Sequence, residues 1–80
     1  MLHIRYFAAL RDQMGMSEES LETNAATPQA LIAELRARDD RADLLAEPFI
    51  RIIINDEIAR EGAALKPGDT IAFCPPFSGG

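Results

Sequence analysis

The order of strand-like and helix-like patterns constrains the fold of this chain more than any other feature. Apolar and polar residues alternate over 2–6, which is the period of a strand with one buried face. Residues 8–14 have short helical character and end at Gly15, which adopts left-handed backbone conformations without penalty. A weaker alternation over 17–23 predicts a second strand with an acidic, solvated face, near an edge of the sheet.

The main helical pattern follows these two strands. Thr27 and Pro28 predict its start, because the hydroxyl accepts a free backbone N–H and proline's fixed φ suits the first helical position. Three apolar residues then share one face: Leu31, Ile32 and Leu35. We expect this helix to end at 38–40 and another turn or two to form over 41–46.

The second half of the chain predicts three further strands. Residues 50–60 form a hairpin pattern that turns at Asn55-Asp56, since both residue types tolerate positive φ. A tight turn over 66–69 has proline second and glycine third, and a last strand follows over 70–74. The order favours an α+β fold, a mixed sheet with one principal helix across one face, as in the ubiquitin-like β-grasp.

Size and charge exclude several classes of protein. With 80 residues the chain has room for one domain and one modest core. A net charge of −5 repels phosphate backbones and anionic membranes, so we expect neither nucleic acid nor membrane as a partner. The single cysteine, Cys74, forms no intrachain disulfide and no signal-peptide pattern is present, so a cytoplasmic location is expected.

Residue types that perform catalysis or bind metals are sparse. His3, the only histidine, lies at the opposite end of the chain from Cys74, so we expect no Cys/His pair. The carboxylates are scattered over polar faces, so no metal site is predicted. Gly79-Gly80 opens no helix, which excludes a phosphate-binding loop. We therefore expect a protein that is not an enzyme by itself.

The end of the chain is its most unusual segment. Pro75 and Pro76 cannot donate to a sheet ladder and favour an extended conformation, so we expect a domain over 1–74 and a flexible, projecting tail over 75–80. Gly80 offers a carboxylate without a side chain, which fits a narrow channel in another protein. The alternative is a frayed, inert tail.

Four segments occur in the same order in one known family: residues 6–11 (YFAALR), 54–57 (INDE), 67–69 (PGD) and 73–80 (FCPPFSGG). The Pro-Pro-x-x-Gly-Gly ending is the most specific of them. With these segments the chain resembles the small subunit of molybdopterin synthase, a ubiquitin-like sulfur carrier.

The resemblance implies a chemistry and a set of partners. In that family a partner that resembles ubiquitin-activating enzymes adenylates the C-terminal glycine with ATP and Mg²⁺, and a persulfide donor supplies the sulfur of a thiocarboxylate. The catalytic large subunit, in a heterotetramer, then transfers this sulfur to cyclic pyranopterin monophosphate for molybdenum cofactor biosynthesis. The small subunit is a non-catalytic co-substrate that binds no cofactor.

The resemblance also implies site residues. Gly80 would carry the sulfur and Gly79 would keep the channel clear, while Phe7 and Arg11 would lie on the partner-docking surface. Strand parity places Phe7 away from the core, although it could instead turn inward beneath residues 8–14. The other expected docking residues extend this surface or form the tail: Ile58, Cys74, Pro75, Pro76, Phe77 and Ser78.

Two residues depart from the family pattern. The family commonly has a bulky apolar residue in place of Cys74 and a smaller one in place of Phe77. We expect Cys74 to be an apolar filler rather than a sulfur relay.

Three other functions fit these features. They are a sulfur carrier for thiamine biosynthesis or tRNA thiolation, a ubiquitin-like protein modifier, and an interaction module with an inert tail. Chain length and the Pro-Pro ending favour the pterin pathway. The acidic net charge further favours docking on a basic subunit that holds a phosphorylated pterin.

Overall fold

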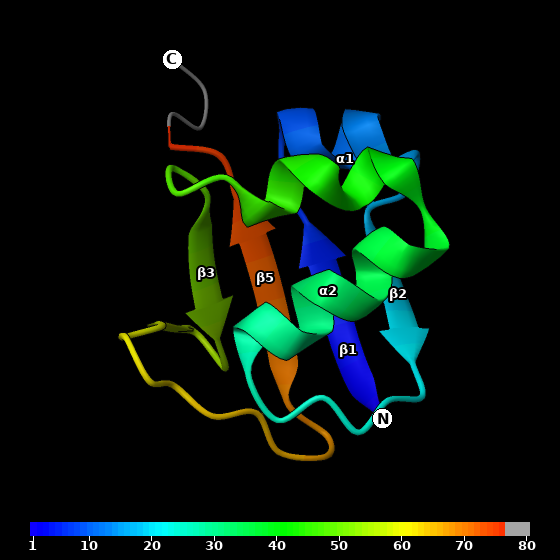
Figure 1. Ribbon diagram of the computed structural model, residues 1–80. Coiled ribbons are helices and arrows are strands. Elements are labelled where there is room, and N and C mark those ends of the chain that lie inside the picture. The colour runs from blue at the N-terminus through cyan, green and yellow to red at the C-terminus, as the bar shows by residue number, and fades with distance from the viewer. Residues whose placement is uncertain (77–80) are drawn as a thin grey trace.

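The computed structural model describes residues 1–76, and Figure 1 shows α2 crossing one face of a sheet. In chain order the elements are β1 (Leu2–Tyr6), α1 (Ala9–Met14), β2 (Glu18–Leu21), α2 (Pro28–Arg38), the 3₁₀ helix η1 (Asp40–Ala46), β3 (Arg51–Ile54), β4 (Glu57–Ile58) and β5 (Thr70–Cys74).

The sheet is mixed and has five strands in the spatial order β2-β1-β5-β3-β4. β1 and β5 are parallel neighbours at its centre, and the other neighbouring pairs are antiparallel. The predicted mixed sheet with one principal helix is therefore confirmed, and so is the edge position of β2. Within residues 1–76 no helix is long and apolar enough to cross a membrane.

The helix α2 begins as its sequence predicts. The Ala30 backbone N–H donates to the Thr27 hydroxyl at 3.1 Å, and Pro28 occupies the first turn. The face predicted to be apolar is buried against the sheet, where it meets the core side chains of β1 and β5. The core is formed by these buried residues: Leu2, Ile4, Tyr6, Leu10, Met14, Leu31, Ile32, Leu35, Ala42, Leu45, Ile50, Leu65, Ile71 and Phe73.

At the edge of this core, hydrogen bonds between polar side chains link two strands to α2. The Tyr6 ring stacks on Phe73 with centroids 6.1 Å apart, and its hydroxyl donates to Glu19 at 2.9 Å. Burial and this hydrogen bond raise the pKa of Tyr6. Arg38 donates to the other Glu19 oxygen at 3.3 Å, so β1, β2 and α2 are joined by one set of side chains.

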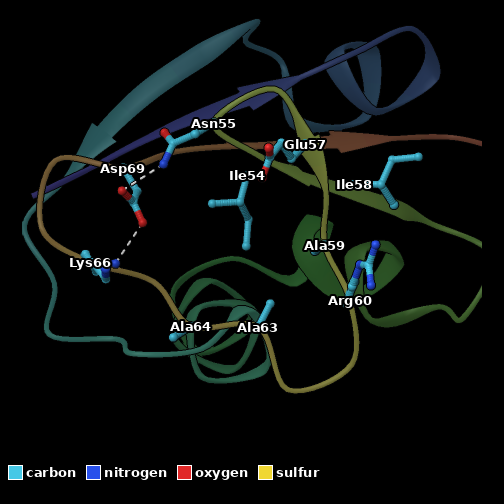
Figure 2. A pocket seen from close by; sticks show the side chains of 10 residues that line it. All are labelled: Ile54, Asn55, Glu57, Ile58, Ala59, Arg60, Ala63, Ala64, Lys66 and Asp69. Atoms are coloured by element: carbon cyan, nitrogen blue, oxygen red, sulfur yellow. Dashed lines mark hydrogen bonds between the residues drawn. The ribbon is translucent and has the colours of Figure 1, made fainter.

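The two predicted turns of the second half are present. Asn55 and Asp56 have φ of 50° and 71°, and the Asn55 amide donates to Asp69 at 2.9 Å, as Figure 2 shows. The Asp69 N–H donates to the Lys66 carbonyl across the turn that contains Gly68, at φ 90°. These contacts fix the β3–β4 hairpin to the start of β5.

Several boundaries differ from the sequence-based expectation. β2 covers Glu18–Leu21 instead of residues 17–23, and η1 begins at Asp40 instead of residue 41. The return strand β4 ends at Ile58 instead of residue 60, although the Ala59 N–H still donates to the Ile52 carbonyl at 2.8 Å. Helix α1 begins at Ala9, because Ala8 has φ 50° and ψ −126° and turns the chain directly after β1. Such a conformation costs a non-glycine residue about 1–3 kcal/mol, and the identity of Ala8 gives no sign of it.

Candidate functional site: the open face of the sheet

The face of the sheet opposite α2 has no helix packed across it in the described part of the chain. We call it the open face. Strand register, with Phe7 continuing the alternation of β1, assigns these side chains to it: His3, Arg5, Phe7, Glu18, Ser20, Arg51, Ile53, Ile58, Thr70, Ala72 and Cys74.

Apolar side chains gather on this face. We define the apolar patch as Phe7, Ile53, Ile58, Ala72 and Cys74. Phe7 is 36% exposed and Ile58 is 69% exposed, and large apolar side chains left open in this way are typical of a contact surface. The prediction that Phe7 points away from the core is confirmed, and the alternative that it turns inward beneath α1 is wrong.

Register places Ile58 in one row across the sheet with Arg5, two residues before Phe7. Ala72 pairs with Arg5 on one side and with Ile53 on the other, and Ile53 pairs with Ile58. At about 4.8 Å between strands, the three steps from β1 to β4 span roughly 14 Å. The predicted extension of the patch to Ile58 therefore agrees with the strand register.

Cys74 ends β5 within the patch and is half-buried. Burial raises the pKa of its thiol, and the nearby positive charge of Arg51 only partly opposes that shift. A thiol that stays protonated is a poor nucleophile, which agrees with the expected role of an apolar filler. Pro75 and Pro76 follow, also half-buried, so the patch leads directly to the root of the tail.

Other predicted site residues are not part of the sheet. Arg11 is exposed on α1. Phe77, Ser78, Gly79 and Gly80 lie outside the described residues. Their roles in docking and in sulfur chemistry stay predictions.

The charge of the open face was not expected from the sequence. The Arg5 guanidinium lies 4.9 Å from the centroid of the Phe7 ring, and Arg51 pairs with Cys74. Glu18, the register partner of Arg5, is the only carboxylate among the strand residues of this face. The open face is therefore positively charged although the net charge is −5, so the net charge is no evidence for an acidic docking surface here.

The sequence already indicated that Arg5 lies on the open face, because strand alternation places Arg5 on the same side of the strand as Phe7. Arg51 and Ile53 could not be placed in this way, since their neighbours depend on how β3 pairs with β5. Parity assigns a side chain to a face, but only register brings residues of distant segments together.

Hollows on the surface include little of the apolar patch. On the open face itself, a hollow of about 320 Å³ is lined by His3, Arg5, Glu18, Ser20 and Thr70 and by none of the patch residues. One of about 420 Å³ lies beside the β3–β4 hairpin, and Figure 2 shows Lys66 and Asp69 among the residues that line it. Of the expected docking residues it includes only Ile58. No group of three or more metal-ligating side chains is found within residues 1–76.

The mixed sheet, the single long helix and the open apolar face define a protein of the ubiquitin-like β-grasp class, as the sequence predicted. The chain belongs to the ThiS family, whose sequence model matches residues 4–80. It is similar to the molybdopterin synthase sulfur carrier subunit of Haemophilus influenzae, with 35% identity over 81 residues that cover 100% of both chains. The resemblance inferred from the four sequence segments is thereby confirmed.

Solved structures share the fold over nearly the full length. A putative molybdopterin converting factor subunit 1 from Pyrococcus furiosus has a TM-score of 0.77 and 26% identity, covering 95% of this chain and 97% of that one. The small archaeal modifier protein 1 from Methanosarcina acetivorans has a TM-score of 0.76 and 27% identity, covering 99% of this chain and 95% of that one.

Proposed function

We propose that this chain is the sulfur carrier subunit of a molybdopterin synthase. The observation that carries the proposal is the full-length similarity to a sulfur carrier subunit, in which both chains are covered from end to end. In this proposal Gly80 carries the sulfur as a thiocarboxylate and delivers it to cyclic pyranopterin monophosphate.

The proposed chemistry begins at the carboxylate of Gly80. A free carboxylate resists nucleophiles because its charge is delocalised and its oxide is a poor leaving group. In adenylation a carboxylate oxygen of Gly80 attacks the α-phosphorus of ATP and pyrophosphate leaves, so that AMP becomes the leaving group. The terminal sulfur of a persulfide then forms a C–S bond as the C–O bond to AMP breaks. A thiol reductant cleaves the S–S bond of the resulting acyl disulfide, which releases the thiocarboxylate and leaves the thiol oxidised to a disulfide. The activating partner must supply Mg²⁺ and the cationic groups that stabilise the phosphoryl charge.

The chain's own contribution is delivery and docking. Gly79 and Gly80 bring no side chain to a channel in the large subunit. The apolar patch lies beside the root of the tail, so a subunit that covers Phe7 and Cys74 would hold the tail at its own active site. In this account the chain is a co-substrate, and catalysis belongs to the large subunit.

Activation at the terminus tests the proposal. Incubation with the activating partner, ATP and a persulfide donor should change the intact mass by the exchange of one oxygen for one sulfur, and fragmentation should place the exchange at Gly80. A sulfur adduct on Cys74, with the terminus unchanged, would reverse the assignment. The similarity to an archaeal modifier makes protein modification the second candidate, and an isopeptide between Gly80 and a lysine of another protein would support it.

A further inference from the structure

The single lysine of the chain and the start of the tail lie at opposite ends of β5. The chain has one lysine, Lys66, and seven arginines. Lys66 lies in the turn before β5, whereas the tail leaves from the other end of that strand, at Pro75. β5 alone rises about 13 Å from Thr70 to Cys74, at roughly 3.3 Å per residue. The only lysine amine therefore lies at the far end of the sheet.

The turn that carries Lys66 is fixed in that position. Its backbone N–H donates to the Asp69 carboxylate at 2.8 Å, a contact drawn in Figure 2, and the Gly68 N–H donates to the Met1 carbonyl at 2.7 Å. Hydrogen bonds from Asn55 and from the Lys66 backbone, together with the positive charge of Lys66, lower the pKa of Asp69.

Arginines supply the positive charge at the tail end. Arg51 pairs with Cys74, the residue directly before the tail, and Arg5 lies over Phe7 on the same face. Arg11 lies on α1, the element that comes after β1 in the chain. All three are exposed, and within residues 1–76 none of them forms an ion pair.

Arginine and lysine differ in how they react with an activated acyl group. A guanidinium stays protonated at any physiological pH and its electrons are delocalised, so it does not attack a carbonyl carbon. A lysine amine is neutral in a small fraction of molecules and forms amides with activated acyl groups. Six residues, 75–80, span at most roughly 20 Å. An amine beside Cys74 is therefore within reach of the terminus in many tail conformations, whereas Lys66 is met only by a tail that folds back along the whole of β5.

We propose that arginine, rather than lysine, at Arg5, Arg11 and Arg51 keeps the activated terminus from acylating its own domain. The inference rests on the proposed activation of Gly80. In the excluded reaction a neutral amine attacks the Gly80 carbonyl carbon, and a C–N bond forms as the C–O bond to AMP breaks. AMP leaves with the electron pair, and the amine proton passes to solvent. Arg5 and Arg51 thus give the open face positive charge, and Arg11 adds positive charge on α1, without an amine that could attack the acyl group.

A full-length chain that carries a chemically made Gly80 thioester of a small thiol tests this inference. Three chains are compared: wild type, Arg51→Lys, and Arg38→Lys as the matched control. Arg38 pairs with Glu19 on the helix-covered side of the sheet, so the control adds the same amine away from the tail root. Circular dichroism checks that all three are folded, and intact mass is followed at mildly alkaline pH.

The expected products differ by one water. The wild-type and Arg38→Lys thioesters should hydrolyse to the free acid. Arg51→Lys should instead lose the thiol and form an internal amide, lighter than the free acid by one water, at a yield about tenfold or more above wild type because its amine competes at an effective concentration near millimolar. Fragmentation of this product should show an amide bond between Gly80 and the lysine side chain at position 51.

Equal amounts of internal amide in all three chains, or an amide to Lys66 in the wild type, would overturn the inference. The proposed function is judged separately, by pyrophosphate release when the wild type meets the activating partner and ATP. Absence of that release would contradict the activation of Gly80 and would leave the thioester comparison interpretable.

Discussion

Deleting Gly80 should abolish sulfur transfer, with conversion of the pterin precursor falling to background. The deletion removes the proposed acyl carbon and leaves Gly79 as a terminus one residue too short for the same channel. Gly79→Val should lower the conversion by at least about 100-fold, and Gly79→Ala should give an intermediate rate, since misplacement of reacting atoms by about 1 Å can cost that much. The measurement is the rate of product formation with the activating partner and the large subunit.

Stability provides the control for these tail variants. The buried core is formed by residues between Leu2 and Phe73, so the free energy of unfolding should stay near that of the wild type. Urea denaturation of each variant measures it. Normal sulfur transfer by the Gly80 deletion would eliminate the carrier function, whatever its stability.

Phe7→Asp should weaken binding to the large subunit by about 2 kcal/mol, which is roughly 30-fold in Kd. The substitution puts a charge where the apolar patch needs an aromatic anchor, and it also removes the ring beneath Arg5. Because Phe7 lies outside the buried core, the fold should be kept. Calorimetric titration with the large subunit measures the affinity, and circular dichroism of the same sample measures the folding.

Ala37→Asp is the matched control, because it adds the same charge at an exposed position of α2, on the other side of the sheet. Its affinity for the large subunit should equal that of the wild type. If Phe7→Asp unfolds the chain, Phe7 contributes to the core. If Phe7→Asp binds normally, the open face is not the docking surface.

Local features of the fold were predictable from the sequence because each depends on residues close together in the chain. Thr27 and Pro28 determine the start of α2, and Asn55-Asp56 form the expected hairpin turn. Alternation in β1 assigns Phe7 to the open face without any knowledge of its neighbours. These predictions needed only backbone preferences and the period of a strand.

The rest depended on how segments pair in space. The parallel pairing of β1 with β5 brings Arg5 beside Ala72, and the pairing of β5 with β3 brings Arg51 beside Cys74. No local pattern specifies these registers, so the positive charge of the open face was missed. Ala8 was missed for a different reason, because its positive φ is imposed by the surrounding structure on a residue type that does not favour it.

Transfer of sulfur from the chain to the pterin tests the central claim most directly. The chain carrying a Gly80 thiocarboxylate is mixed with the large subunit and cyclic pyranopterin monophosphate, and its intact mass is followed as product forms. We predict that the mass returns to that of the carboxylate, by exchange of one sulfur for one oxygen, in step with formation of the dithiolene. Product formation with the thiocarboxylate unchanged, or a bound chain whose sulfur is never released, would contradict the account.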